Sequence, residues 1–319
     1  MRFAVVGCGR AARRLHLPAI RAAGAEATAF ASRTRTSAER ARDEWGSGVV
    51  VDAWEDAVAR DDVDAVAIAT PNRLHRDVAI AAMQAGKHVL VDKPMATTVK
   101  ECDDMLDASV ANDVVLVPFQ NTRFAPAFVA AHDAVVDGRI GHVTGVRAAF
   151  GHGGPHGWAP DAVWFFDRAE SGGGCLIDLG VHLVDLVRYV TGHEIVEVAA
   201  ELHSHAGEVE TDAQLLVRFD NRAIGTLHAS WSARPGPDHQ LTVIGTDGTL
   251  HLDNRTALTL LPKDRLPLPE DVGSPYDVLL DSVRDGVPPV LSGQDGRAAV
   301  AVIEAAYRAA DERRTATVA

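Results

Sequence analysis

The chain has 319 residues, of which 47% are hydrophobic and 24% are charged. This composition excludes collagen, coiled coil and a disordered polypeptide, and the length predicts two domains. The formal net charge of −13 argues against a nucleic-acid-binding protein. Because no apolar run approaches the roughly 18 residues of a membrane span, we expect no membrane association either.

Acidic residues are concentrated in the second part of the chain. Residues 1–119 carry 15 basic and 17 acidic side chains (net −2), and residues 120–319 carry 16 and 27 (net −11). Either the nearly neutral first part accommodates an anionic cofactor, or the acidic second part only favours solubility. Cys8, Cys102 and Cys175 form no metal-binding or disulfide pattern. We expect buried thiols in a cytoplasmic protein.

Residues 1–119 alternate short apolar strands with amphipathic helices. Near-continuous apolar strands separated by helices are typical of a parallel sheet that is covered on both faces. We therefore predict an α/β protein whose first domain is a doubly wound Rossmann domain over residues 1–119. The predicted strands are 3–6, 27–31, 49–51, 64–69, 88–91 and 114–117, and the predicted helices are 10–23, 36–45, 72–85 and 97–111.

Residues 120–319 follow a different pattern, typical of an α+β substrate-binding and oligomerisation domain with a large, open, mostly antiparallel sheet. The alternating strands should present an apolar face, so we predict a homodimer or homotetramer formed through the sheet. The last helix is a candidate to pack back on the first domain. The predicted strands are 142–150, 195–203, 212–219, 222–231 and 239–246, the helices are 125–136, 173–190, 275–285 and 293–312, and residues 151–170 form a long loop.

The segment from Val5 to Ala12 reads V-V-G-C-G-R-A-A, which places G-x-G-x-x-A between a strand and a helix. Gly7 permits a tight turn, Gly9 lets the backbone approach a pyrophosphate, and Ala12 lets the helix pack on the sheet. Arg10 lies where free helix N–H groups attract phosphate. A plain tight turn is the alternative, but this context favours a dinucleotide site.

The end of the second strand indicates which dinucleotide binds. NAD sites usually place an acidic residue there to hold the ribose 2′-hydroxyl, but this chain has Ser32 and Arg33. A hydroxyl and a guanidinium suit a 2′-phosphate, so NADP(H) is preferred and NAD(H) remains possible. Alternatively, Arg33 points to solvent and the site accepts both.

Two segments suggest catalytic chemistry. Lys93 follows the fifth strand, and strand ends in such a sheet face the ligand crevice; a surface lysine is the alternative. Asp178, His182 and Asp185 are spaced i, i+4, i+7 on one helix face, so a carboxylate can orient an imidazole. We expect the three glycines at 172–174 to let the backbone approach a ligand. The alternatives are a zinc site, for which no further ligand is evident, or a buried helix whose polar groups satisfy each other, with Asp185 structural.

Together these motifs resemble the glucose–fructose oxidoreductase / inositol dehydrogenase / rhizopine catabolism (Gfo/Idh/MocA) family over essentially the whole chain. Asp92 departs from the family's usual Glu, and the lack of an acid at residues 32–33 is similar to NADP-using members. The residues that carry the resemblance are the glycine loop, Asp92-Lys93-Pro94, the segment from Gly172 to Asp185, Thr70-Pro71-Asn72-x-x-His75 and Gly138-x-Ile140-Gly141.

The resemblance implies hydride transfer between a nicotinamide cofactor and a carbinol or ketone of a sugar, a cyclic polyol or a related keto-derivative. Lys93, Asp178 and His182 would surround the carbinol, with His182 as general base, Lys93 sharing the proton transfer and Asp178 holding His182 or a neighbouring hydroxyl. A cis peptide bond before Pro94 is expected. The alternative is a non-catalytic NADP-binding regulatory protein on the same fold.

Several further residues are weaker candidates. His16 and His75 are either packing residues or ligand contacts, and no metal site is predicted. The candidate cofactor-binding residues are Gly7, Gly9, Arg10, Ala12, Ser32, Arg33, Thr70, Pro71, Asn72, His75, Asp92, Lys93 and Pro94, and the candidate substrate-binding residues are Gln120, Asn121, Arg123, Trp158 and Trp164.

Overall fold

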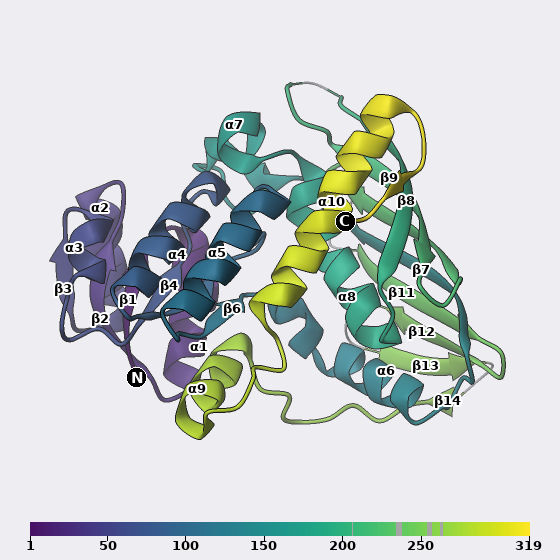
Figure 1. Ribbon diagram of the computed structural model, residues 1–319, viewed down its shortest axis with the longest axis horizontal. Helices are drawn as coiled ribbons and strands as arrows, with labels where there is room; N and C mark the ends of the chain where they lie inside the picture. The colour runs from purple at the N-terminus through teal and green to yellow at the C-terminus, as the bar shows by residue number, and fades with distance from the viewer. Residues whose placement is uncertain (206, 234–237, 254–256, 262–263) are drawn as a thin grey trace. The chain divides into compact units, whose positions relative to one another are not determined.

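The computed structural model describes residues 1–205, 207–233, 238–253, 257–261 and 264–319 (Figure 1). It divides into two compact units, of which the first contains Met1–Gln120 with Gly273–Arg297 and the second Asn121–Val272 with Ala298–Ala319. The first unit therefore also contains Gln120 and Gly273–Arg297, which the predicted division into 1–119 and 120–319 assigns to the second domain. The reason is Tyr276, which is fully buried with its ring centroid 5.3 Å from that of Phe3.

The first unit is built on a six-stranded parallel sheet in the order β3-β2-β1-β4-β5-β6. The predicted doubly wound sheet is confirmed. Every residue of β4 is buried, as expected for a strand with helices on both faces. The strands are β1 (Arg2–Val6), β2 (Glu26–Ala31), β3 (Val49–Val51), β4 (Ala65–Ile68), β5 (His88–Val91) and β6 (Leu116–Pro118).

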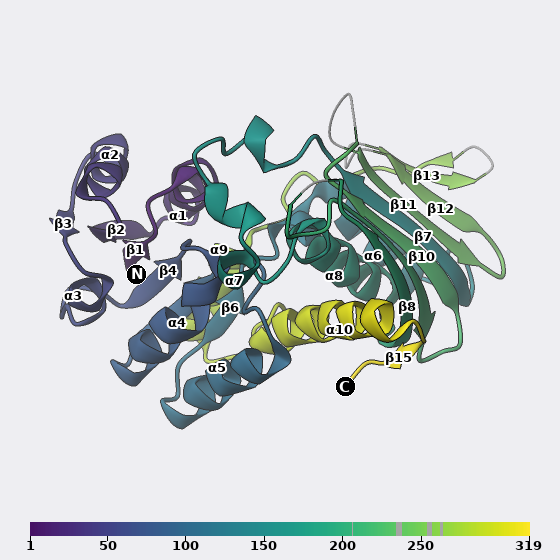
Figure 2. The same cartoon turned by 90° about the horizontal axis from the view of Figure 1, so that it is seen from above.

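Helices cover both faces of this sheet, and Figure 2 shows α4 and α5 side by side on one of them. A π-helical turn, Ala12–His16, follows the glycine loop and leads into α1. Thr98 and Glu101 form a capping box at the start of α5. The helices are α1 (Leu17–Ala22), α2 (Arg35–Trp45), α3 (Trp54–Val58, not predicted), α4 (His75–Gln84), α5 (Val99–Ala111) and α9 (Pro275–Asp285).

The second unit contains a nine-stranded sheet in the order β14-β13-β12-β11-β7-β10-β9-β8-β15. Its only parallel neighbours among the described strands are β7 and β10, so the predicted mostly antiparallel sheet is confirmed. The last four strands were not predicted. The strands are β7 (Val143–Gly151), β8 (Ile195–His203), β9 (Asp212–Phe219), β10 (Ile224–Ser230), β11 (Asp238–Gly245), β12 (Thr249–Asp253), β13 (Ala257–Leu261), β14 (Asp264–Arg265) and β15 (Ala316–Thr317).

Two helices, α6 (Pro126–Val136) and α8 (Val181–Thr191), pack together within this unit, and Figures 1 and 2 show both against the same face of its sheet. A short helix, α7 (Arg168–Ser171), precedes the segment that leads into α8. The last helix, α10, spans Gly293–Glu312, and its residues up to Arg297 belong to the first unit. No described helix is both long and apolar enough to cross a bilayer.

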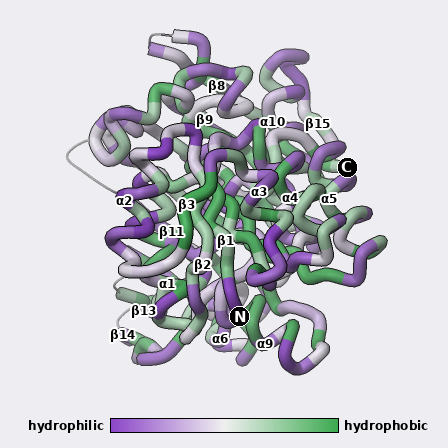
Figure 3. Tube along the Cα trace, turned by 90° about the vertical axis from the view of Figure 1, so that its left-hand side faces the viewer, coloured by the Kyte–Doolittle hydropathy of each residue, from purple (hydrophilic) through white to green (hydrophobic). Residues whose placement is uncertain are grey.

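The exposed face of the second sheet is not the apolar surface that the alternation predicts. In β9 and β10 the buried residues, such as Leu215 and Leu227, join one core with α6 and α8. The apolar face is therefore covered by helices of the same unit. In Figure 3 the hydrophobic colour likewise follows the inner strands, as β1 shows in the first unit. The outward residues of β9 and β10 are Gln214, Leu216, Arg218, Ile224, Thr226 and His228.

Candidate active site

The glycine loop has the geometry that its sequence predicts. Gly7 has a φ of 90°, and a Cβ there would lie 2.4 Å from the backbone of Ala69, so only glycine fits. A Cβ at Gly9 would meet nothing within 4 Å, which leaves that side of the loop open to a phosphate. Ala12 is fully buried, as expected where the following helix packs on the sheet. The loop therefore fits a dinucleotide pyrophosphate.

Ser32 and Arg33 lie beside this loop at the end of β2. The Ser32 hydroxyl accepts a hydrogen bond from the Cys8 amide at 3.3 Å, so its own proton remains available to a ligand. Arg33 is exposed, and its side chain has no hydrogen bond or ion pair to any described residue. Burial raises the pKa of the Cys8 thiol to about 12, so Cys8 is a packing residue and no nucleophile.

His75 joins the segments that follow β4 and β5. The imidazole is fully buried, with Nδ1 2.8 Å from the Pro94 carbonyl oxygen and Nε2 3.0 Å from that of Thr70. Burial lowers the pKa of His75 and so favours the neutral ring, which can donate a hydrogen bond to only one of these two carbonyls. Of the two interpretations that the sequence left open, the contacts favour packing.

Asp92 forms a pair with the buried His16 in this unit. His16 Nε2 lies 3.4 Å from Asp92 Oδ2, and its Nδ1 lies 2.8 Å from the Tyr276 hydroxyl. Burial alone would raise the pKa of Asp92, but the neighbouring His16 and Lys93 hold it below its ordinary value. Asp92 Oδ1 accepts the Lys93 amide at 2.8 Å, and the peptide bond to Pro94 is cis, as predicted. The shorter acid therefore still holds the backbone of the candidate catalytic lysine.

Two side chains on the same sheet edge as Lys93 lack partners. Thr70 follows β4, Lys93 follows β5 and Gln120 follows β6, and these strands are neighbours. The Thr70 hydroxyl and both polar atoms of the Gln120 amide are buried without a hydrogen-bond partner among the described residues. Leaving such groups unsatisfied costs about 1–3 kcal/mol each. A polar ligand that reaches this edge would remove that cost, so the site fits a bound nicotinamide nucleotide.

Asp178 and His182 lie in the second unit, on a helix that does not have the uniform α-helical geometry assumed from the sequence. Asp178 is in a π-helical turn, Leu176–Gly180, and His182 is in the first turn of α8. Both side chains are buried, as expected for residues of an enclosed site.

Their partners are residues that the sequence analysis did not single out. Asp178 Oδ2 accepts a hydrogen bond from Trp231 Nε1 at 3.0 Å, and His182 Nδ1 lies 3.2 Å from the Thr122 hydroxyl. The indole therefore helps to orient the carboxylate and the threonine the imidazole, and the expectation that Asp178 holds His182 or a neighbouring hydroxyl stays a prediction. No sequence signal identified either partner.

Arg123 and Asp185 are buried together as an ion pair, which explains why two charged side chains lie in the interior. Arg123 Nε donates to Asp185 Oδ2 at 3.0 Å, and its Nη2 donates to Oδ1. The guanidinium also lies 5.1 Å from the centroid of the Tyr189 ring. Asp185 is therefore structural, which is one of the alternatives that the sequence left open. The same two bonds occupy the guanidinium of Arg123, a residue that was predicted to reach a substrate.

Aromatic side chains of the long loop pack on one another. Trp164 stacks on Phe165 with a centroid distance of 3.9 Å, and Trp158 meets the same ring edge-on at 5.2 Å. Phe166 lies 5.6 Å from Trp231, the residue that holds Asp178. Both predicted tryptophans are thus partly core residues, although neither is fully buried. Asn121 begins a 3-10 turn that also contains Thr122.

The predicted role of the three glycines needs correction. A Cβ on Gly174 would lie 2.0 Å from the Glu210 carbonyl oxygen, and one on Gly173 would lie 1.9 Å from the Tyr307 hydroxyl. Gly172 has a φ of 84° and ends α7. The turn at Gly172 and the chain's own atoms around the next two positions, rather than a ligand, therefore require glycine here.

Comparisons with known proteins identify relatives of both parts of the chain. Residues 1–119 match the family model described as "Oxidoreductase family, NAD-binding Rossmann fold", and residues 128–251 match the GFO/IDH/MocA C-terminal domain. The 1,5-anhydro-D-fructose reductase of Ensifer adhaerens is 32% identical, with 99% of this chain and 98% of that protein covered.

The chain belongs to the Gfo/Idh/MocA oxidoreductase family. Another relative of this chain, myo-inositol 2-dehydrogenase of Thermotoga maritima, is 30% identical to it over 79% of each chain. The crystal structure of GenD2 from gentamicin A biosynthesis in complex with NAD is 31% identical, with a TM-score of 0.87 over 100% of this chain and 96% of that one. The resemblance predicted from the motifs is confirmed. Within the part of the chain that the structure describes, no group of three or more His, Cys, Asp or Glu side chains is placed to hold a metal ion.

Proposed function

We propose that this chain transfers hydride between a nicotinamide dinucleotide and a carbinol or ketone of a sugar, a cyclic polyol or a related keto-derivative. Family membership and the relatives' names support this substrate class. The observation that carries the proposal is that Lys93, Asp178 and His182 are all present, and that neighbouring residues hold the Lys93 backbone, the Asp178 carboxylate and the His182 imidazole.

The first unit would hold the cofactor. Gly7, Gly9 and Arg10 would bind the pyrophosphate at the helix start, and the unpartnered Thr70 and Gln120 would bind the nicotinamide end. When bound, the nicotinamide accepts or donates a hydride at C4.

We propose a preference for NADP(H) over NAD(H). Ser32 has a free hydroxyl proton, and Arg33 is an exposed guanidinium without a described partner, so both are available to a 2′-phosphate. Replacing Arg33 with alanine should lower the affinity for NADP(H) by about 1.5–3 kcal/mol and leave that for NAD(H) nearly unchanged. Arg40→Ala, an exposed arginine of α2, is the control. Titration of both cofactors decides the matter, and a clear NAD(H) preference of the wild type would contradict it.

The remaining residues would move the proton. In the oxidative direction His182 would remove the hydroxyl proton as general base. Thr122 would orient the ring, and Asp178 would hold His182 or a neighbouring hydroxyl. Lys93 would hydrogen-bond the same or an adjacent hydroxyl and share the transfer.

A substrate screen with two variants tests this function. Wild-type protein with NADP⁺ and a panel of sugars and cyclic polyols should reduce the cofactor, and His182→Ala and Lys93→Ala should each lower kcat about 10²–10⁴-fold. Both variants should bind NADP(H) as tightly as the wild type. Lys100→Ala, an exposed lysine of α5, is the control. Cofactor binding without turnover of any substrate would instead favour the second candidate, a non-catalytic NADP-binding regulator.

We also propose that copies of the chain associate through the outer face of the second sheet as a homodimer or homotetramer. Leu216 and Ile224 are 55% and 60% exposed there, among polar neighbours that can form hydrogen bonds across an interface. Light scattering at micromolar concentration tests this, and a stable monomer would contradict it. Cys8, Cys102 and Cys175 are buried thiols, which supports a cytoplasmic enzyme.

A further inference from the structure

Glu210 is a buried carboxylate for which the proposed function has no role. It lies two residues before β9 and is 4% exposed. Its Oε1 accepts hydrogen bonds from the Gly174 amide at 2.8 Å, the Leu176 amide at 3.0 Å and the Tyr307 hydroxyl at 2.8 Å. Free backbone N–H groups at the start of a helix are satisfied by such an acceptor. Glu210 therefore caps the helical segment that carries Asp178.

The main chain beside Glu210 reaches Asp178 by a second route. The Glu210 carbonyl oxygen accepts the Cys175 amide at 2.9 Å, and the Thr211 carbonyl oxygen accepts the Trp231 amide at 2.7 Å. Trp231 in turn donates its indole N–H to Asp178 at 3.0 Å. The segment 210–211 thus holds both the backbone on which Asp178 stands and the side chain that orients its carboxylate.

The fit around this carboxylate is tight. Gly173 and Gly174 have no room for a Cβ, because the Tyr307 hydroxyl and the Glu210 backbone fill that space. The helix start is therefore pressed against these two residues and cannot shift without losing the bonds to Oε1. Burial and the neighbouring Glu210 raise the pKa of Tyr307 well above its ordinary value, so this hydroxyl remains a donor to the carboxylate.

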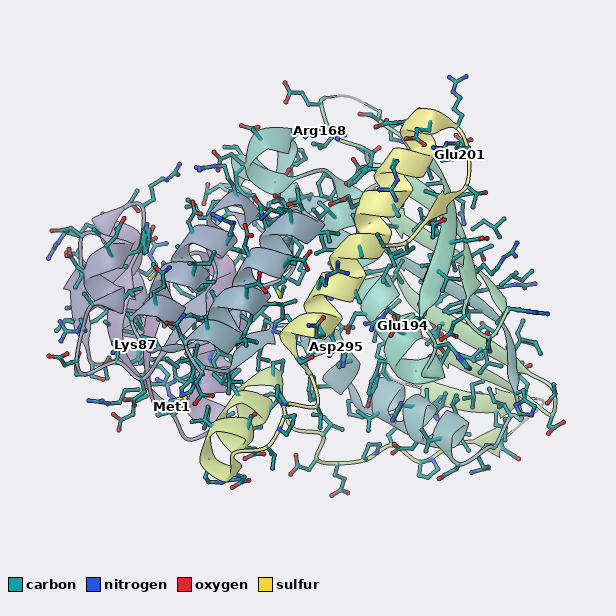
Figure 4. All side chains as sticks on the ribbon, viewed as in Figure 1. Met1, Lys87, Arg168, Glu194, Glu201 and Asp295 are labelled. Atoms are coloured by element: carbon teal, nitrogen blue, oxygen red, sulfur yellow. The ribbon has the colours of Figure 1, made fainter. Side chains whose placement is uncertain are left out.

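The two oxygens of Glu210 differ in their surroundings. Oε1 accepts the three bonds, whereas Oε2 is buried with no hydrogen-bond partner among the described residues. Arg168 of α7, which Figure 4 labels, is half-exposed and forms an ion pair with Glu210, its Nη2 lying 3.8 Å from Oε2. A glutamine at this position keeps one oxygen that can accept the three hydrogen bonds and replaces Oε2 with an uncharged NH₂ group. The Glu210→Gln variant therefore tests the hydrogen bonds without the negative charge.

We propose that Glu210 is a positioning residue for catalysis. It fixes the place of Asp178 by accepting hydrogen bonds from the amides at the start of the helical segment that carries Asp178. The proposal rests on the proposed catalytic role of Asp178. Displacing a catalytic group by about 1 Å can cost about 100-fold in rate, so loss of this cap should act on turnover rather than on cofactor binding.

The test compares Glu210→Ala, Glu210→Gln and Tyr307→Phe with the wild type, well below the unfolding temperature of each. We expect Glu210→Ala to lower kcat about 10–100-fold with an unchanged Kd for NADP(H). Glu210→Gln should stay within about threefold of the wild type, because it keeps the acceptor. Tyr307→Phe removes one donor only and should fall between them. Glu208→Ala, an exposed glutamate two residues away, is the matched control and should be unaffected.

A double-mutant cycle separates positioning from a general structural role. If Glu210 acts through Asp178, adding Glu210→Ala to Asp178→Asn should not lower kcat further. The same fold-loss in both backgrounds, an unaffected kcat in Glu210→Ala, or a Glu210→Gln variant as poor as Glu210→Ala would each overturn the proposal.

Amide hydrogen exchange provides a readout that does not depend on turnover. Glu210→Ala should speed exchange at Gly174 and Leu176 at least tenfold while the exchange of β1 in the first unit stays unchanged, and an unchanged rate at both amides would overturn the cap. A wild-type protein without turnover would contradict the proposed function alone, and exchange would then decide whether the cap exists. If Glu210→Ala does not fold, Tyr307→Phe carries the same comparisons with a smaller expected loss, and Glu210→Gln remains the near-wild-type reference.

Discussion

The start of the helix that carries Asp178 allows a quantitative test of the packing at Gly174. Replacing Gly174 with alanine would place a Cβ 2.0 Å from the Glu210 carbonyl oxygen and 2.9 Å from the Glu210 amide nitrogen. Real Cβ atoms do not approach backbone atoms so closely, so the helix start and the segment before β9 must move apart. That movement lengthens the bonds from the Gly174 and Leu176 amides to the Glu210 carboxylate.

The expected cost has two parts. Overpacking a rigid site typically costs about 1–3 kcal/mol, and weakening one hydrogen bond to a charged group costs about 1.5–3 kcal/mol. Together they lower the free energy of unfolding of the second unit by roughly 2.5–6 kcal/mol. For a unit of about 150–250 residues each kcal/mol is worth about 2–4 °C, so the midpoint should fall by about 5–24 °C.

Calorimetry and urea unfolding of Gly174→Ala and the wild type measure this loss. Gly157→Ala is the matched control, because a Cβ there meets nothing within 4 Å and its φ is not positive. The control should change the free energy of unfolding by no more than about 1 kcal/mol. If Gly174→Ala is as stable as the control, the close contact with Glu210 does not exist and the reasoning is refuted.

Three further predictions follow from single contacts. Asp185→Ala removes the carboxylate that pairs with the buried Arg123 and should destabilise by about 3–5 kcal/mol in urea unfolding; a loss under about 1 kcal/mol would contradict the buried pair. Burial alone raises the pKa of Asp212, but three hydroxyl donors hold it below its ordinary value. Its stabilisation is therefore present above the unfolded-state pKa of about 3.9 and is lost as pH falls through the lower folded value. Asp212→Asn should thus be less stable than the wild type at pH 7, by a margin that shrinks below about pH 4, and a constant margin would disprove the linkage. Trp231→Phe removes the indole N–H from Asp178 and should lower kcat about tenfold without changing NADP(H) affinity, and unchanged turnover would show that this bond does not matter.

Local pattern predicted most of the architecture. The apolar strands of the first unit, the glycine loop and the residues after β5 all depend on neighbours a few positions away, so periodicity and motif spacing identified them. The short strands β12 to β15 and the helix α3 were missed, because two to five residues carry too little periodic signal. Alternation also identified the buried residues of the second sheet. It did not show that helices of the same unit cover them, because periodicity carries no information about the covering element.

The sequence by itself determined the family, the two kinds of sheet and the candidate catalytic residues, because the motifs and apolar patterns that indicate them occupy contiguous or regularly spaced positions. Only the tertiary structure decided how those residues are held. Trp231 is 53 positions from Asp178, Thr122 is 60 from His182, and Tyr307 is 97 from Glu210. Partners so far apart leave no periodic trace, since a single hydrogen bond across the fold constrains one side chain at each end and nothing between them.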